Sequence, residues 1–217
     1  EFYQRLPDLP TPPTTAAPSV GSFQERYENL LKSGITHVLS IHAASALSGI
    51  FNAARIAAES FGERVRVIDS QQITMGLGFQ VLAAAEAAGR GAILDEILSI
   101  IESVKQRVRV FALLDTLEYL HRSGRVSWAK AMLGGFLNLK PLIELRFGAV
   151  ERLGQARTHS QGVARLIESL QSMGPIERLA VLHSNAEAAA RGLLADLKPK
   201  LPAPPLVVNV TTVIGTH

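Results

Sequence analysis

Short apolar runs alternate with longer amphipathic stretches through the first half of this chain, and that alternation restricts the fold more than any other feature of the sequence. A short apolar run bounded by turn residues is typical of a buried strand, whereas apolar residues spaced three and four apart indicate a helix. Strands that alternate with helices predict a largely parallel sheet covered by helices. The predicted strands are residues 37–42, 65–68 and 109–113, and the predicted helices are residues 23–31, 49–61, 76–88 and 93–108.

The second half of the chain combines short helices with a predicted β-hairpin. Two strand-like runs, residues 140–145 and 149–153, are linked through Phe147-Gly148, which suits a hairpin turn. We predict an α/β protein of two lobes, residues 1–114 with a mainly parallel sheet and residues 115–217 with a mixed sheet. The other elements predicted in the second lobe are helices over 116–121, 127–133, 158–173 and 187–197, and strands over 179–183 and 206–210.

The first 20 residues differ from the rest because they hold a cluster of prolines. Proline has no backbone N–H and restricts the residue before it, so such a cluster favours irregular chain. We expect an extended loop without helices or strands here. The prolines are Pro7, Pro10, Pro12, Pro13 and Pro18.

Composition excludes several classes of function. The chain has no cysteine, which excludes disulfides, thiolate metal sites and a cysteine nucleophile. The six histidines lack the spacing of metal ligands, so no metal and no cofactor are predicted. The net charge is only +3 with scattered basic residues, which argues against nucleic-acid binding. No segment reaches the roughly 20 apolar residues of a membrane helix, so we expect a cytoplasmic protein without membrane insertion.

A serine-bearing turn stands between the first predicted strand and the helix that follows it. The free N–H groups of a first helical turn, together with the hydroxyl of Ser48, offer hydrogen-bond donors to a carboxylate or a phosphate. The alternative is that Ser48 only caps its helix by accepting a hydrogen bond from an N–H two or three residues on. The spacing alone leaves both interpretations open. The stretch is Ser45-Ala46-Leu47-Ser48-Gly49-Ile50-Phe51-Asn52-Ala53-Ala54.

This stretch resembles the Leu-Ser-Gly-Thr-Tyr-Gln-Ser-Ala signature of the DegV family, the bacterial fatty-acid-binding proteins. Further segments match the family in the same order along almost the whole chain, and the ordered set is more specific than any one motif. They are the Phe2-Tyr3 and Pro13-Thr14-Thr15-Ala16-Ala17-Pro18-Ser19 region, Val67-Ile68-Asp69-Ser70 with Gly76-Leu77-Gly78, Thr116-Leu117-Glu118-Tyr119-Leu120, Ser123-Gly124-Arg125-Val126-Ser127, Leu139-Lys140-Pro141-Leu142 with Gly148, and Val213-Ile214-Gly215-Thr216-His217.

The resemblance implies a non-catalytic lipid carrier. Such a protein would bind one long-chain fatty acid, such as palmitate or oleate, in the cleft between the lobes, and a fatty acid kinase subunit would phosphorylate the presented carboxylate. The carboxylate-binding residues carried over are Thr15, Ser48 and His217. Ala16 and Ala17 stand where the family has Ser and Gln, so Ser48 is expected to matter more here than in a typical relative.

The acyl chain would lie against the apolar faces of two helices. The acyl-chain pocket residues are Ile50, Phe51, Ala54 and Leu77. Core packing is the alternative use of these side chains, because an amphipathic helix needs an apolar inner face in any protein. Arg125 is expected to dock the kinase or to contact an acyl phosphate, with a solvated surface position as its alternative.

Two other functions remain open at this stage. An α/β enzyme could use the same turn to hold a small phosphorylated or carboxylated metabolite, and a regulatory module bound to another protein is a third reading. Gly76-Leu77-Gly78 lacks the third glycine of a dinucleotide fingerprint, and Ser48 is not in a Gly-x-Ser-x-Gly elbow. Compared with the family, the chain also lacks a first strand and the segment after His217, so we expect the source protein to be longer.

Overall fold

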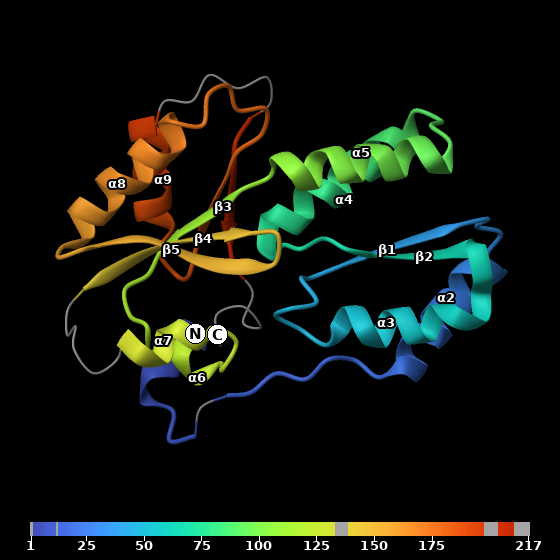
Figure 1. Cartoon of the computed structure of the whole chain (residues 1–217), viewed down its shortest axis with the longest axis horizontal. Helices are drawn as coiled ribbons and strands as arrows, with labels where there is room; N and C mark the ends of the chain where they lie inside the picture. The colour runs from blue at the N-terminus through green and yellow to red at the C-terminus, as the bar shows by residue number, and fades with distance from the viewer. Residues whose placement is uncertain (1, 12, 133–138, 198–203, 211–217) are drawn as a thin grey trace. The chain divides into compact units, whose positions relative to one another are not determined.

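The computed structural model describes residues 2–11, 13–132, 139–197 and 204–210 and has an α/β fold (Figure 1). The chain forms two compact units. Unit 1 contains residues 1–15, 111–144 and 151–217, and unit 2 contains residues 16–110 and 145–150. The lobe boundary expected between residues 114 and 115 stays a prediction.

Unit 2 is built on the parallel pair of strands β1 (Val38–His42) and β2 (Val65–Asp69), which confirms the predicted parallel sheet. The register runs from Val38 beside Val65 to His42 beside Asp69, so both strands end at the same edge. The predicted helices of this part are confirmed as α2 (Val20–Lys32), α3 (Ile50–Ala58), α4 (Thr74–Gly89) and α5 (Leu94–Arg107). A 3-10 helix (Glu59–Arg64) follows α3 and is kinked at Gly62, which has a φ of 57°.

Each face of the β1–β2 sheet carries its own apolar core, and in Figure 1 the pair α2 and α3 lies on the opposite side of these strands from α4 and α5. This follows from the alternation of side chains along a strand. Val38, Val65 and Val67 pack with α2 and α3, whereas Leu39, Ile41 and Ile68 pack with α4 and α5. The buried core residues are Tyr27, Ala57, Ala58 and Val65 on the first face and Ala84, Ala87, Ile97 and Ile101 on the second.

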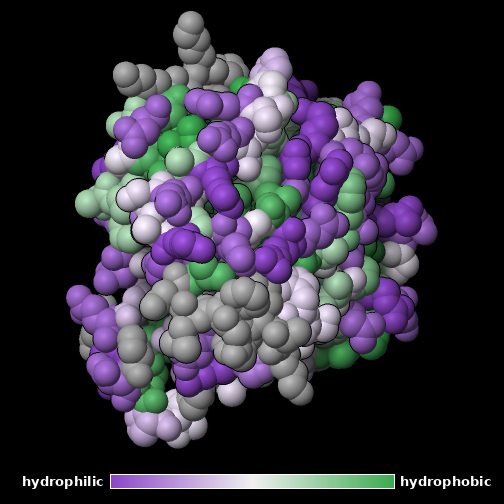
Figure 2. All heavy atoms as spheres, turned by 60° about the vertical axis from the view of Figure 1, so that its left-hand side comes forward, coloured by the Kyte–Doolittle hydropathy of each residue, from purple (hydrophilic) through white to green (hydrophobic). Residues whose placement is uncertain are grey.

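Unit 1 combines parallel and antiparallel pairing, as the predicted mixed sheet requires. Strand β3 (Val110–Leu113) bonds to β4 (Lys140–Arg146), which forms a hairpin with β5 (Ala149–Ala156). Strands β6 (Ala180–His183) and β7 (Leu206–Asn209) are parallel. The helices are α6 (Glu118–Arg122), α7 (Ser127–Met132), α8 (His159–Gln171) and α9 (Glu187–Leu197). Hydrophilic residues are interspersed with hydrophobic ones on the face that Figure 2 draws.

The expectation of irregular chain over the first 20 residues is wrong for residues 2–8. Helix α1 (Phe2–Arg5) continues into a 3-10 helix (Leu6–Asp8). Pro7 lies in the first turn of that helix, where a missing N–H costs nothing. Leu6 is buried, and the Tyr3 hydroxyl donates to the Val210 carbonyl oxygen at 2.6 Å, so tertiary contacts hold this segment.

None of the helices in the described ranges has both the length and the apolar character needed to cross a membrane.

Candidate functional site

The turn between β1 and α3 is a compact hydrogen-bonded loop at the edge where β1 and β2 end. The N–H groups of Leu47 and Ser48 donate to the Ala44 carbonyl oxygen at 2.9 and 3.1 Å. Ala44 is completely buried, and its own N–H donates to the Gln72 carbonyl oxygen at 2.9 Å. The carboxyl ends of parallel strands are where open α/β sheets bind ligands. The sequence-predicted turn therefore lies at the position in unit 2 that such sheets use for binding.

Ser48 is half-buried immediately before the N-cap residue Gly49 of α3. Its Oγ accepts a hydrogen bond from the Ile50 N–H at 3.3 Å, which is the local capping contact of the alternative interpretation. A hydroxyl accepts through its lone pairs and can still donate its proton. The capping contact and donation to a carboxylate are thus compatible, and neither interpretation excludes the other.

Asp69 organises this turn and has no role in the sequence-based prediction. At the end of β2, its carboxylate accepts from the Ser45 hydroxyl at 2.5 Å and from the Gln71 N–H at 2.8 Å. The Ser45 N–H also points to both carboxylate oxygens at 3.3 Å. Asp69 thereby ties the turn after β1 to the turn after β2. Its place at the carboxyl end of β2 marks it as an edge residue, but no local pattern shows its bond to Ser45, 24 positions away.

The tip of the β4–β5 hairpin belongs to unit 2 and closes onto the same turns. The Gly148 N–H donates to the Gln71 carbonyl oxygen at 2.8 Å, and the Gln72 amide Nε2 donates to the Leu145 carbonyl oxygen at 3.3 Å. Phe147 and Gly148 both have positive φ angles, 48° and 79°, as a type I′ hairpin turn requires. The predicted hairpin through these two residues is confirmed.

The four predicted acyl-chain residues come from helices on opposite faces of the β1–β2 sheet. Ile50, Phe51 and Ala54 belong to α3, and Leu77 belongs to the first turn of α4. Ala54 is completely buried, whereas the other three are half-buried. Core packing of Ala54 requires this full burial, so core packing and a pocket role both remain possible uses of Ala54.

The remaining predicted site residues belong to unit 1 or lie outside the described residues. Thr15 is half-buried and belongs to unit 1. His217 lies outside the described residues. Arg125 also belongs to unit 1, and its Nη1 donates to the Ser123 carbonyl oxygen at 3.0 Å. Its basic neighbour Arg122 pairs with Glu118 at 2.5 Å, which favours a surface role for Arg122.

A half-buried histidine at the end of β1 contacts the Ser40 hydroxyl, which in turn contacts the Tyr27 hydroxyl. His42 Nε2 lies 2.7 Å from Ser40 Oγ, which lies 2.7 Å from the Tyr27 hydroxyl oxygen. The edge of the His42 ring also meets Phe23, with ring centroids 5.3 Å apart. Burial lowers the pKa of His42 from its ordinary value of 6.5, because the charged imidazolium would lose hydration there.

This shift predicts a pH-dependent stability. The unfolded chain takes up a proton on His42 near pH 6.5 and the folded protein resists it, so the unfolded state binds more protons. The free energy of unfolding should therefore fall as the pH drops below 6.5 and be insensitive to this group above it. Urea unfolding from about pH 5 to about pH 8 measures this. The replacement His42→Gln should flatten the profile, and His37→Gln at an exposed position should not; an unchanged His42→Gln profile would contradict the assignment.

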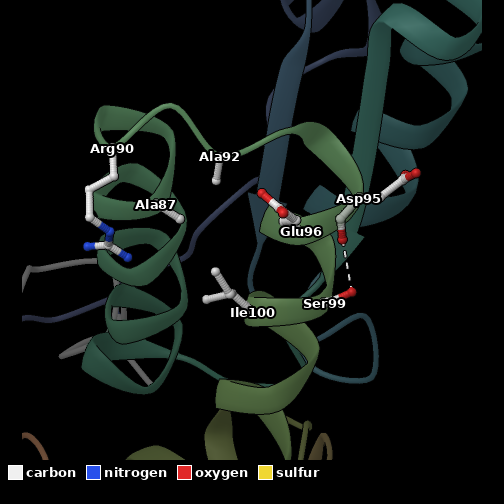
Figure 3. Close-up of a pocket in the computed structure, with 7 residues that line it drawn as sticks. All are labelled: Ala87, Arg90, Ala92, Asp95, Glu96, Ser99 and Ile100. Atoms are coloured by element: carbon white, nitrogen blue, oxygen red, sulfur yellow. Dashed lines mark hydrogen bonds between the residues drawn. The ribbon is translucent and has the colours of Figure 1, made fainter.

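A separate surface hollow of about 500 Å³ lies between the end of α4 and the start of α5 (Figure 3). The Glu96 carboxylate there already accepts from the Ile93 N–H at 3.1 Å, and the backbone carbonyl oxygen of Asp95 accepts from Ser99 Oγ at 2.9 Å. The hollow lies at the opposite end of α4 from Leu77. Its lining residues are Ala87, Arg90, Ala92, Asp95, Glu96, Ser99 and Ile100.

Within the described ranges, no group of three or more His, Asp or Glu side chains is placed to hold a metal ion. At the turn, the N–H groups of Leu47, Ser48 and Ile50 already donate within the protein, whereas the Ser48 hydroxyl keeps a proton that suits an anionic oxygen ligand.

The fold and this turn define an α/β protein with a serine-bearing turn at the carboxyl edge of a parallel sheet. A family model described as "Uncharacterised protein, DegV family" matches residues 1–217. A DegV domain-containing protein of Streptomyces coelicolor is 38% identical over 210 residues, which cover 95% of this chain and 75% of the relative. Protein DegV of Bacillus subtilis is 34% identical over 223 residues, covering 100% of this chain and 79% of the relative. The chain belongs to the DegV family.

Solved structures of the family have the same fold. One is described as "Fatty Acid Binding of a DegV family Protein from Thermus thermophilus"; it is 33% identical with a TM-score of 0.89, and the match covers 100% of this chain and 79% of that one. Another is described as "Crystal Structure of DegV, a fatty acid binding protein from Bacillus subtilis", 32% identical with a TM-score of 0.86, covering 100% of this chain and 78% of that one. These neighbours are DegV proteins that bind fatty acids.

Proposed function

We propose that this protein is a carrier that binds one long-chain fatty acid and holds its carboxylate with the turn between β1 and α3. The observation that carries the proposal is Ser48: its Oγ accepts from the Ile50 N–H, which leaves the hydroxyl proton to donate to a carboxylate oxygen. Membership of a family whose solved relatives are described as fatty-acid-binding proteins supports the choice of ligand. Thr15 and His217 join the proposal as further headgroup residues through the motif resemblance alone.

The acyl chain supplies most of the proposed binding energy. Burial of apolar surface contributes roughly 0.8 kcal/mol per methylene, so a chain of palmitate length offers about 10 kcal/mol before the costs of association. A carboxylate removed from water must be hydrogen-bonded, and this is the requirement that Ser48 meets. The proposed chain contacts are Ile50, Phe51, Ala54 and Leu77.

The proposal predicts that the purified protein retains fatty acid from the expression host. Denaturing extraction followed by lipid mass spectrometry should recover close to one long-chain fatty acid per chain. Protein stripped of lipid should take up added palmitate or oleate, whereas a long-chain alcohol, which lacks the carboxylate, should bind more weakly. Absence of co-purified lipid together with no uptake of either acid would reject the carrier function.

We further propose that a fatty acid kinase subunit phosphorylates the presented carboxylate and that Arg125 contacts this partner or the acyl phosphate. Arginine suits this role because its guanidinium forms charge-assisted hydrogen bonds with phosphate. The variant Arg125→Ala should lower acyl phosphate formation by the kinase and leave fatty acid affinity unchanged. The exposed Arg64 of unit 2 offers a charge-matched control as Arg64→Ala. Equal kinase rates in the two variants would remove Arg125 from the proposal.

A further inference from the structure

Three buried side-chain oxygens near the start of α4 have no hydrogen-bond partner among the described residues: Gln72 Oε1, Thr74 Oγ1 and Gln80 Oε1. We call these three residues the glutamine cluster. Gln72 is 1% exposed and Gln80 is 0% exposed. A buried polar atom left unpaired costs roughly 1 to 3 kcal/mol, so three in a segment of nine residues require an explanation.

The amide groups are held so that their oxygens, and not their nitrogens, remain unpaired. Gln72 Nε2 donates to the Leu145 carbonyl oxygen, and Gln80 Nε2 donates to the carbonyl oxygens of Ser70 at 3.0 Å and Gly76 at 3.2 Å. Rotating either amide by 180° would place its oxygen against carbonyl oxygens. The two glutamines therefore offer acceptors, and the Thr74 hydroxyl can accept or donate.

Gly76 stands next to both glutamine side chains. A Cβ atom at Gly76 would lie 2.7 Å from Gln72 Oε1, and the Gly76 carbonyl oxygen receives the Gln80 amide. The backbone around it is strained, because Gln71 and Thr74 have φ angles of 54° and 50°, values that are costly for residues with a side chain and most of all for a β-branched threonine. Strain of this kind is concentrated at ligand-binding positions in proteins.

We propose that the glutamine cluster is a binding site for one hydroxyl group, supplied either by a water molecule or by a hydroxylated acyl chain. The occupant must donate a proton to an amide oxygen, which an ionised carboxylate cannot do. It should also be neutral, since none of the three residues carries a charge to balance a buried ammonium group. Leu77, in the same first turn of α4, is a proposed acyl-chain contact, so the acyl-chain source rests on the proposed function. A water molecule as the source of the hydroxyl group does not depend on the proposed function.

The variant pair Thr74→Val and Thr74→Ser separates an occupied site from a dry one. Valine keeps the shape of threonine and removes Oγ1, whereas serine keeps the oxygen at the same strained position. If a hydroxyl group occupies the site, Thr74→Val should melt several degrees below the wild type and below Thr74→Ser, because the occupant loses a partner. If the site is dry, valine removes an unpaired polar atom and should raise the melting temperature, which would overturn the proposal.

Two further measurements identify the source of the hydroxyl group. A crystal structure of the lipid-free protein at high resolution should show a water molecule within hydrogen-bond distance of at least two of the three oxygens; an empty space there would overturn the water source. Competition between stearate and a positional series of hydroxystearates should show one isomer binding about threefold to tenfold tighter, a preference kept in Thr74→Ser and lost in Thr74→Val. An ordered water without any such preference assigns the site to water. Failure of every fatty acid to bind would reject the carrier function and leave the melting test of the site intact.

Discussion

Replacing Ser48 by alanine is expected to weaken binding of a long-chain fatty acid roughly 10- to 150-fold. A hydrogen bond to a charged group contributes about 1.5 to 3 kcal/mol, and each 1.4 kcal/mol corresponds to about tenfold in affinity. Ala16, Ala17 and Ile50 have no side-chain donor that could replace the lost hydroxyl, which leaves Thr15 and His217 as the other proposed headgroup residues. Equilibrium dialysis of labelled palmitate with the lipid-free protein measures the change.

The same variant also tests the capping interpretation. The contact from the Ile50 N–H to Ser48 Oγ is long at 3.3 Å, and Gly49 is the N-cap residue, so its loss should cost less than about 1 kcal/mol of stability. A lower melting temperature with unchanged affinity would show that Ser48 is only a capping residue. Ser48→Thr keeps the hydroxyl and should bind nearly normally. Ser60→Ala removes a hydroxyl just beyond the other end of α3, where Ser60 Oγ donates to the Ala57 carbonyl oxygen, and should not alter affinity.

The fold could be predicted from the sequence wherever the signal is local. Apolar spacing identified α2 to α5 because each helix has an inner face to bury. Phe147-Gly148 identified the hairpin because Gly148 tolerates the positive φ that its turn needs. The proline cluster misled the prediction near the start of the chain. Burial of Leu6 and the bond from Tyr3 to Val210 hold the helices there, and their partners are remote in sequence.

In the candidate site, too, the residues placed by local sequence could be predicted and those placed by long-range contacts could not. Ser48 could be predicted because the strand, the turn and the helix that place it are contiguous. The role of Asp69 could not, since its bond to Ser45 joins residues 24 positions apart. The bond between Gln72 and Leu145 spans 73 positions, so no local pattern shows that the hairpin tip reaches this turn. Register and sheet pairing determine such contacts, and a single sequence states neither.

Replacing Gly76 by alanine is expected to destabilise the protein by about 1 to 3 kcal/mol, even though alanine is the better helix former. Gly76 is buried in the first turn of α4, and a Cβ atom there would lie 2.7 Å from both Gln72 Oε1 and Val110 Cγ2. Relief of this overlap requires both Gln72 and Val110 to move, which would weaken the bond from Gln72 to Leu145, one of the bonds that hold the hairpin tip. Urea unfolding of Gly76→Ala and the wild type measures the difference. Close packing against Gln72 and Val110 explains why residue 76 is a glycine, without any need for a phosphate that approaches its backbone.

Gly89, at the other end of α4, provides the matched control, because a Cβ atom built there meets no atom within 4 Å. Gly89→Ala gains helix propensity without overlap and should be neutral or stabilising by up to about 1 kcal/mol. If the free energy of unfolding falls in Gly76→Ala and does not fall in Gly89→Ala, the steric cost at Gly76 is separated from any general effect of glycine replacement. If Gly76→Ala proved as stable as Gly89→Ala, the Gln72 side chain would have room to withdraw, and the close packing that holds its amide oxygen against the first turn of α4 would not exist. The glutamine cluster would then lose the geometry on which its hydroxyl site depends.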